Sequence, residues 1–250
     1  MIYLGIDIGF SATVRSTGIC VLNPQDADPV VCRHVKTSET MATIEKLLAG
    51  RKPSVISIDG PLVPGVGKQA FQIINRYREC ERLLSGGIFQ KRCKSGPTNS
   101  PRGQALHQQA TLIARFLSKN YPGVPIFEAF PNAFLGIMMP DSVFSKPIRR
   151  GIKSDVFWVF AIQRSNLMKL LLRGLFAKHK HDQLCRVCHN LNNHDERAAF
   201  VCAVTARAAH LNQSIMIRTK KDGAIALSPR NLTQRWASSI LKARLTGTSV

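Results

Sequence analysis

Short apolar segments separated by turn residues dominate the first part of the chain. Residues 2–8, 18–22 and 30–35 are rich in apolar and β-branched side chains, and Asp28-Pro29 marks the turn before the last of them. Segments of this length with turns between them are typical of neighbouring antiparallel strands. The pattern therefore predicts a three-stranded meander at the N-terminus.

Longer segments with helical spacing follow and alternate with further short strands. Met41, Ile44, Leu47 and Leu48 recur on one side of a helix that Gly50 could end. Loops are expected over residues 85–102 and 179–193. The remaining expected elements are helices over 40–49, 68–84, 104–117, 154–172 and 195–210 and strands over 54–58, 124–128 and 224–227. This order predicts an α/β fold, with a mixed sheet covered by helices on both faces.

The composition favours a folded protein with an anionic partner. Hydrophobic residues make up 44% of the 250 residues, which excludes global disorder. The chain carries 35 Lys and Arg against 15 Asp and Glu, a formal net charge of +20. A polyanion relieves the self-repulsion of such a chain, and nucleic acid, either DNA or RNA, is the commonest one.

Other protein classes are not expected from the sequence. No apolar run is long enough to span a membrane, and Asp7 interrupts the first apolar stretch, so neither a membrane partner nor a secretory signal is predicted. Seven cysteines, an odd number, favour reduced thiols rather than a disulfide framework. A cytoplasmic location follows from these observations.

Acidic residues stand at the ends of several expected strands. Asp7, Asp59 and Glu128 each close a strand, and Asp195 begins an expected helix. Strand ends in an α/β sheet meet at one edge, where sites form. Clustered carboxylates suit hard divalent cations such as Mg²⁺ or Mn²⁺, which can promote phosphodiester cleavage. Simpler roles stay open: turn residues for Asp7 and Asp59, an arginine partner for Glu128 and a helix cap for Asp195.

Several of these segments resemble one known family. They are Ile6–Gly9, Ile58–Pro61, Cys80–Arg82, Phe127–Pro131 and His194–Glu196 with Cys202–Ala206 after it. Over residues 2–228 the chain is similar to the predicted nucleases of the domain of unknown function 429 family, which is placed in the RNase H-like, RuvC-related superfamily. The resemblance implies an RNase H-like fold: a mixed five-stranded sheet, its first three strands antiparallel, with flanking helices.

The resemblance also implies a nuclease with a two-metal site. In it Asp7, Asp59, Glu128 and Asp195 would be both the metal ligands and the catalytic residues. Asp195 matches the family pattern least well, and Glu196 could take its place. The domain would then cover residues 1–230 with a helical, His- and Cys-rich insertion over about 141–193, followed by a basic C-terminal segment, 231–250.

Two further motifs in the sequence indicate other kinds of site. Gly5–Gly9 also resembles the first phosphate loop of the actin-like kinases and ATPases, but no second phosphate loop is evident. A structural zinc site is a further possibility, because Cys185 and Cys188 form a Cys-x-x-Cys pair. Its other ligands could be His189 and His194, or His179 and His181 upstream.

Basic residues cluster in and around the expected loop over 85–102. Phosphate contacts from such residues would give affinity that depends on salt but little on sequence. The alternative function is a non-catalytic nucleic-acid-binding or assembly protein on the same fold. The candidate contacts are Arg76, Arg78, Arg82, Lys91, Arg92, Lys94 and Arg102.

Overall fold

The protein is an α/β structure built on one mixed sheet of seven strands. This computed structural model describes residues 1–9, 11, 13–63, 77–219 and 223–246. The strand order is β3-β2-β1-β4-β5-β7-β6. The strands are β1 (Tyr3–Asp7), β2 (Thr17–Leu22), β3 (Val30–Val35), β4 (Val55–Asp59), β5 (Ile126–Ala129), β6 (Ser214–Thr219) and β7 (Gly223–Pro229). Strands β1, β4, β5 and β7 are parallel, and β2, β3 and β6 pair antiparallel with their neighbours.

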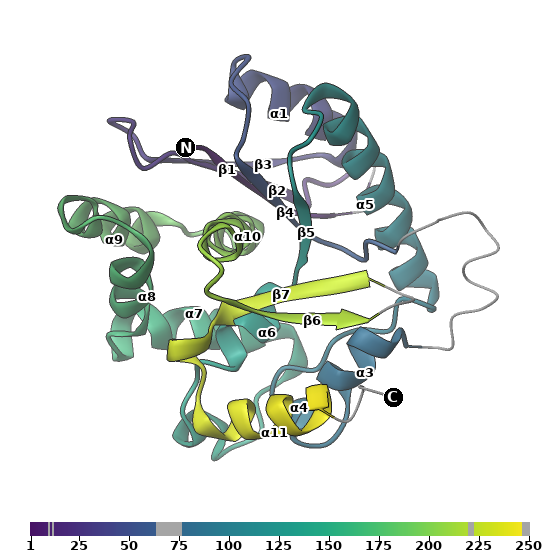
Figure 1. The fold of residues 1–250 in the computed structure, drawn as a ribbon, viewed down its shortest axis with the longest axis vertical. Coiled ribbons are helices and arrows are strands. Elements are labelled where there is room, and N and C mark those ends of the chain that lie inside the picture. The colour runs from purple at the N-terminus through teal and green to yellow at the C-terminus, as the bar shows by residue number, and fades with distance from the viewer. Residues whose placement is uncertain (10, 12, 64–76, 220–222, 247–250) are drawn as a thin grey trace.

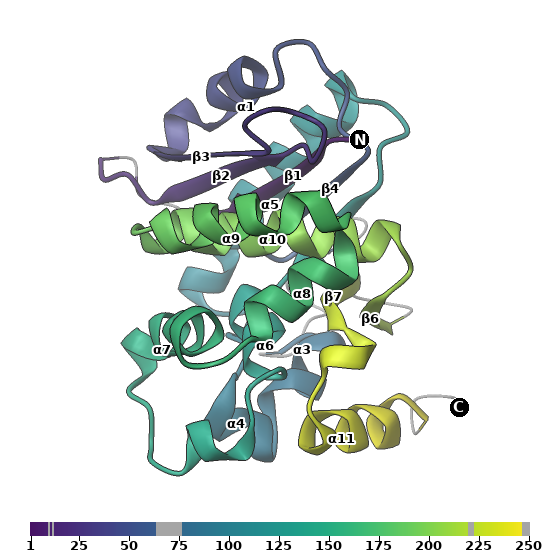
Figure 2. The same cartoon turned by 90° about the vertical axis from the view of Figure 1, so that its left-hand side faces the viewer.

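Helices cover both faces of this sheet. Figure 2 shows α1 on one side of β1–β3, with α9 and α10 on the other side. Figure 1 shows α5 on the far side of the sheet from the paired helices α8 and α9. The helices are α1 (Thr40–Leu48), α3 (Glu79–Ser85), α4 (Ile88–Arg92), α5 (Pro101–Asn120), α6 (Pro131–Gly136), α7 (Lys153–Val159), α8 (Leu167–Leu175), α9 (His181–Asn190), α10 (His194–His210) and α11 (Arg235–Thr246).

The alternation of side chains along β1 and β4 creates two cores. Leu4, Ile6, Ile56 and Ile58 point to one face and pack with residues of α1 and α5. Tyr3 and Val55 point to the other face and join the core around α10. Asp7 lies four residues after Tyr3, and Asp59 lies four residues after Val55. Because side chains alternate between the two faces of a strand, both aspartates point to the α10 face.

Two glycines let α10 lie directly on the sheet. A Cβ added at Gly5 would come within 2.2 Å of the Ala199 carbonyl oxygen, and one added at Gly18 within 2.0 Å of the Asp195 carbonyl oxygen. Neither strand could approach the helix so closely with any larger residue. Gly18 in particular brings the first turn of α10 onto the ends of β1 and β2.

Substitution of Gly18 by Ala is expected to lower the free energy of unfolding by about 1–3 kcal/mol, because the added methyl group forces the helix away from the sheet. Chemical denaturation measures this change. Gly174→Ala in α8 is the matched control, because nothing lies within 4 Å of its added Cβ. The control is expected to be neutral or stabilising. Equal stability of Gly18→Ala and the wild type would contradict the packing argument.

Several sequence-based expectations need correction. The sheet has seven strands rather than five, because β6 and β7 extend it beyond β5. The expected loop over 179–193 is largely the helix α9, and the loop over 85–102 contains the short helix α4. Within the part of residues 68–84 that the structure describes, the helix begins only at Glu79.

The expected helix over 154–172 is divided. Helix α7 ends at Val159, a short π-helical segment spans Phe160–Arg164, and α8 begins at Leu167. The C-terminal basic segment forms α11, which packs through Ala237 and Leu241 into the core around α10. No helix in the described ranges has both the length and the apolar character needed to cross a bilayer.

Candidate acidic site

Strand register places two of the predicted acids side by side. Asp7 of β1 pairs with Asp59 of β4 on one side and with Gly18 of β2 on the other. Gly18 in turn pairs with His34 of β3. Four neighbouring strands therefore present the row Asp59, Asp7, Gly18 and His34 at one edge of the sheet, on the face that α10 covers.

The Asp7 and Asp59 carboxyl groups share a hydrogen bond and repel each other when both are charged. Burial raises the pKa of Asp7 well above its ordinary value, and the charges on Asp59 and Asp195 raise it further. Burial and the Glu128 charge raise the pKa of Asp59 to about 7, although the hydrogen bond from Asp7 opposes that shift. The pair therefore holds a proton more readily than an isolated aspartate does.

The raised pKa values make stability depend on pH in a defined direction. In the folded state the pKa of Asp59 is about 7, whereas in the unfolded chain its carboxyl group loses its proton near the ordinary aspartate pKa of 3.8. Between these values the folded state binds more protons, so stability falls as pH rises. We expect a loss of about 1–3 kcal/mol from pH 4 to pH 8, allowing for solvent screening. Urea denaturation between pH 4 and pH 8 measures this loss of stability. The Asp59→Asn variant should show a smaller dependence of stability on pH. The same pH dependence in the variant and in the wild type would contradict the raised pKa of Asp59.

Asp195 lies beside this pair because of how α10 begins. Asn193 caps the helix, and its Oδ1 accepts hydrogen bonds from the backbone N–H groups of Asp195 (2.8 Å) and Glu196 (3.2 Å). Helix α10 thus starts directly over Gly18, and the Asp195 charge contributes to the raised pKa of Asp7. Asp195 is therefore not the cap itself, and its carboxylate faces the site.

His34 is a site residue that the sequence did not single out. Its Nε2 lies 2.8 Å from Asp195 Oδ2, and its Nδ1 lies 3.2 Å from Nδ2 of Asn193. The Asn193 Oδ1 is used for capping and its Nδ2 donates to the ring Nδ1, whereas the Nε2–Asp195 contact is close but not aligned as a hydrogen bond. The signal in the sequence was a polar side chain at the inward position of β3, after Val30 and Cys32.

Glu128 does not lie on the same face of the sheet as Asp7 and Asp59, and it is paired with an arginine. It pairs in register with Ile58, so its side chain leaves β5 on the opposite face from Asp7 and Asp59. Arg78 Nη1 and Nη2 donate to its Oε2 (2.9 Å) and Oε1 (2.5 Å), and the Leu62 backbone N–H donates to Oε2 at 3.0 Å. The predicted metal ligand is therefore half of a buried, bidentate ion pair.

The remaining acids suit a hard divalent cation. Asp7 and Asp59 offer carboxylate oxygens from adjacent strands, and their mutual repulsion favours a cation between them. Throughout the described residues, no group of three or more His, Cys, Asp and Glu side chains is arranged to hold a metal ion. Mg²⁺ commonly binds through one or two carboxylates, with water and substrate phosphate completing its shell. The Asp7–Asp59 pair therefore fits such an ion.

Cys202 lies under the same pair but does not offer a nucleophile. It is fully buried on α10, and burial followed by the Asp59 and Asp7 charges raises its pKa well above the usual thiol value. A thiol of this kind stays protonated and unreactive at neutral pH.

The predicted zinc ligands are not assembled. Cys188 is buried in the core, while Cys185 is half-buried on the same helix. His194 Nδ1 instead lies 3.6 Å from Asp155 Oδ1 at the start of α10. These residues and His189 are all described, and they form no group able to hold a metal. Cys185 and Cys188 lie one turn apart on α9, where Cys188 contributes to packing.

Two of the predicted nucleic-acid contacts have structural roles instead. The Arg78 side chain is fully buried against Glu128 and Glu81. Arg92 pairs with Asp141 at 2.6 Å, and its guanidinium lies 4.3 Å from the Trp236 ring centroid and 4.6 Å from that of Phe144. Arg78 and Arg82 therefore do not form one exposed face.

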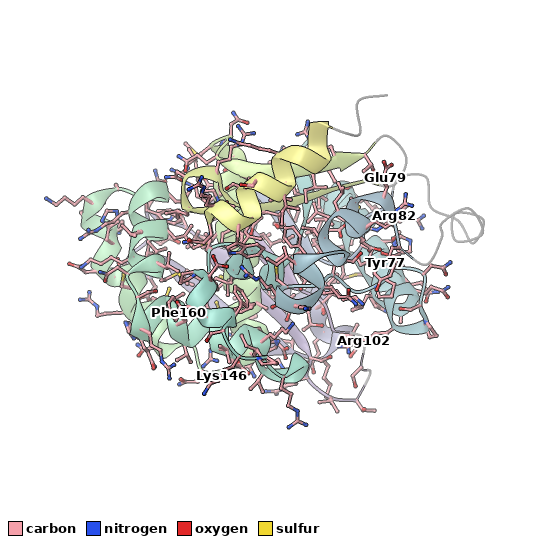
Figure 3. All side chains as sticks on the ribbon, turned by 90° about the horizontal axis from the view of Figure 1, so that it is seen from below. Tyr77, Glu79, Arg82, Arg102, Lys146 and Phe160 are labelled. Atoms are coloured by element: carbon pink, nitrogen blue, oxygen red, sulfur yellow. The ribbon has the colours of Figure 1, made fainter. Side chains whose placement is uncertain are left out.

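The other predicted contacts are exposed, apart from Arg76, which falls outside the described residues. Figure 3 shows Arg82 and Arg102 on the same side of the molecule. The exposed set consists of Arg82, Lys91, Lys94 and Arg102.

Comparison with known proteins adds no assignment. The chain matches no protein-family model, and no curated protein matches its sequence.

Proposed function

We propose that the protein is a metal-dependent nuclease that hydrolyses phosphodiester bonds of DNA or RNA. The observation that carries this proposal is the Asp7–Asp59 pair: two neighbouring carboxyl groups with raised pKa values in a chain of net charge +20. Repulsive acids at a strand edge are costly unless a cation or a proton offsets them. A protein so rich in Lys and Arg attracts nucleic acid to that edge.

The strand order supports an RNase H-like fold for this nuclease. The first five strands lie in the order β3-β2-β1-β4-β5, the first three are antiparallel, and β4 and β5 continue in parallel with β1. This arrangement is the one implied by the resemblance to the domain of unknown function 429 family. The strands β6 and β7 would then be additions to that core.

In this proposal each residue of the site has a defined task. Asp7 and Asp59 would hold Mg²⁺ or Mn²⁺ through their deprotonated carboxylates. Such an ion would supply an activated water and stabilisation of the leaving oxygen. Asp195 adds negative charge beside Asp7, while His34 and Asn193 fix the position of its carboxylate and of the helix start. The Arg78–Glu128 pair anchors α3 to β5 below the site.

Cleavage assays with purified protein test the function. Labelled single-stranded and double-stranded DNA, RNA, an RNA–DNA hybrid and a branched junction would be compared in Mg²⁺, Mn²⁺ and EDTA. We expect metal-dependent cleavage that Asp59→Asn abolishes and that the exposed-site control Asp182→Asn retains. Tight binding without cleavage of any substrate would contradict the nuclease and favour a non-catalytic nucleic-acid-binding protein.

A further inference from the structure

A surface groove lies between the outer strand β3 and helix α9. It has a volume of about 460 Å³. Strand β3 is the edge of the sheet, so among the described residues one side of its backbone has no partner strand. Figure 2 shows α9 lying along the same side of the molecule as α10, below β3. The groove is lined by Asp28, Pro29, Val30, Val31, Cys32, Arg33, Gln183, Arg186, Val187 and Asn190.

The lining of the groove extends along β3 from the turn before the strand toward His34. At the turn, Lys180 Nζ and Gln183 Nε2 donate to the backbone carbonyls of Asp26 and Ala27, which ties the start of α9 to this turn. At the other end of the lining, β3 continues from Arg33 to His34, whose Nε2 lies 2.8 Å from Asp195 Oδ2. A ligand that fills the groove therefore ends next to His34, which lies two strands away from Asp7 in the same row.

The lining of the groove combines apolar and cationic groups. Val30, Val31 and Val187 supply apolar surface, and the side-chain amides of Gln183 and Asn190 supply donors and acceptors. Arg33 and Arg186 are both exposed on the rims, and neither forms an ion pair with any described residue. The one acid of the lining, Asp28, belongs to the turn before β3.

We propose that this groove binds an unpaired stretch of nucleic-acid strand and delivers it to the acidic site. Its volume is that of a small-ligand pocket, which fits one or two nucleotides whose bases are free. The guanidinium groups would contact phosphates, while the valines and amides would contact an unstacked base. This inference rests on the proposed nuclease function, because it names the form of substrate that the same site receives.

Binding of a short fluorescein-labelled single-stranded oligonucleotide, measured in EDTA so that no cleavage occurs, tests the groove. The double variant Arg33→Ala/Arg186→Ala is compared with Arg115→Ala/Lys119→Ala, which removes the same charge from exposed positions on α5, on the opposite face of the sheet. We expect the groove variant to bind at least about tenfold more weakly than the wild type. The slope of log K against log salt concentration should become shallower by about 1.4, since two phosphate contacts are lost. The control should keep an affinity within about twofold of the wild type. Equal losses in both variants, or no loss in the groove variant, would overturn the proposal.

Hydrogen exchange locates the ligand independently of substitution. The oligonucleotide should protect backbone amides of residues 30–33 and leave the other edge strand, β6, unprotected. Absence of protection on β3 would overturn the proposal that the groove binds nucleic acid. The edge strand could then bind a different ligand, such as a peptide strand. Wild-type protein that cleaves but shows no β3 protection refutes the groove alone, whereas wild-type protein that neither binds nor cleaves refutes the nuclease as well.

Discussion

Replacing Asp7 by Asn is expected to abolish cleavage and at the same time to stabilise the folded protein. The pKa of Asp7 is raised by burial and by the Asp59 and Asp195 charges, so the folded state tolerates this carboxylate poorly. A neutral amide of the same shape removes the repulsion and keeps a hydrogen bond to Asp59. We expect a gain of about 1–3 kcal/mol in the free energy of unfolding at pH 8, against a loss of at least about a hundredfold in cleavage.

Opposite changes in stability and activity distinguish a functional acid from a structural one. A structural Asp7 would be needed for folding, so its Asn variant would be less stable. Denaturant unfolding and cleavage are measured on the same preparation, with Asp182→Asn as the exposed control, which should change neither quantity. A destabilised Asp7→Asn protein, or one that still cleaves, would contradict the assignment of Asp7.

Replacing Arg78 by Met is expected to be the most destabilising of these changes. Its guanidinium lies between two buried carboxylates, at 2.5 Å from Glu128 Oε1 and 2.9 Å from Glu81 Oε1. Glu81 also accepts hydrogen bonds from the Thr98 hydroxyl and from the Thr98 N–H. Loss of the cation leaves both acids without their partner, a change that typically costs about 3–5 kcal/mol.

A double-mutant cycle shows whether Arg78→Met loses stability because buried carboxylates are left without a cation. The Arg78→Met/Glu128→Gln variant removes one of the two acids, so it should recover part of the stability that Arg78→Met loses. Denaturation of the two single variants and the double variant gives the coupling energy. Additive losses would contradict the account of this ion pair, and if Arg78→Met does not fold, recovery of a folded double variant still tests it.

The sequence was sufficient for the acids that lie on neighbouring strands. Asp7 and Asp59 both end apolar strands, which predicts that they meet at one edge of the sheet, whereas their direct pairing across β1 and β4 comes from the structure. The meander of β1, β2 and β3 was also predicted, because a glycine follows the first strand and Asn23-Pro24 and Asp28-Pro29 mark the turn between the second and the third. These features depend on local pattern, which a single sequence carries.

Features that depend on register or on contacts between distant segments could not be predicted. Glu128 also ends a strand, but pairing with Ile58 turns its side chain to the other face. His34 reaches Asp195 only because Gly18 admits the start of α10. The sequence predicts a loop where helix α9 forms, because the His, Cys and polar residues there obscure the apolar face of Leu184 and Cys188.

The most direct test of the account is the binding of Mn²⁺ to purified protein without nucleic acid. Isothermal titration would compare the wild type with Asp7→Asn/Asp59→Asn and with the charge-matched control Asp28→Asn/Asp182→Asn. The account predicts that the wild type and the control bind Mn²⁺ with the same affinity and release protons on binding, whereas the site variant does not bind. Undiminished binding by the site variant, or no binding by the wild type, would contradict a divalent-cation site at Asp7 and Asp59.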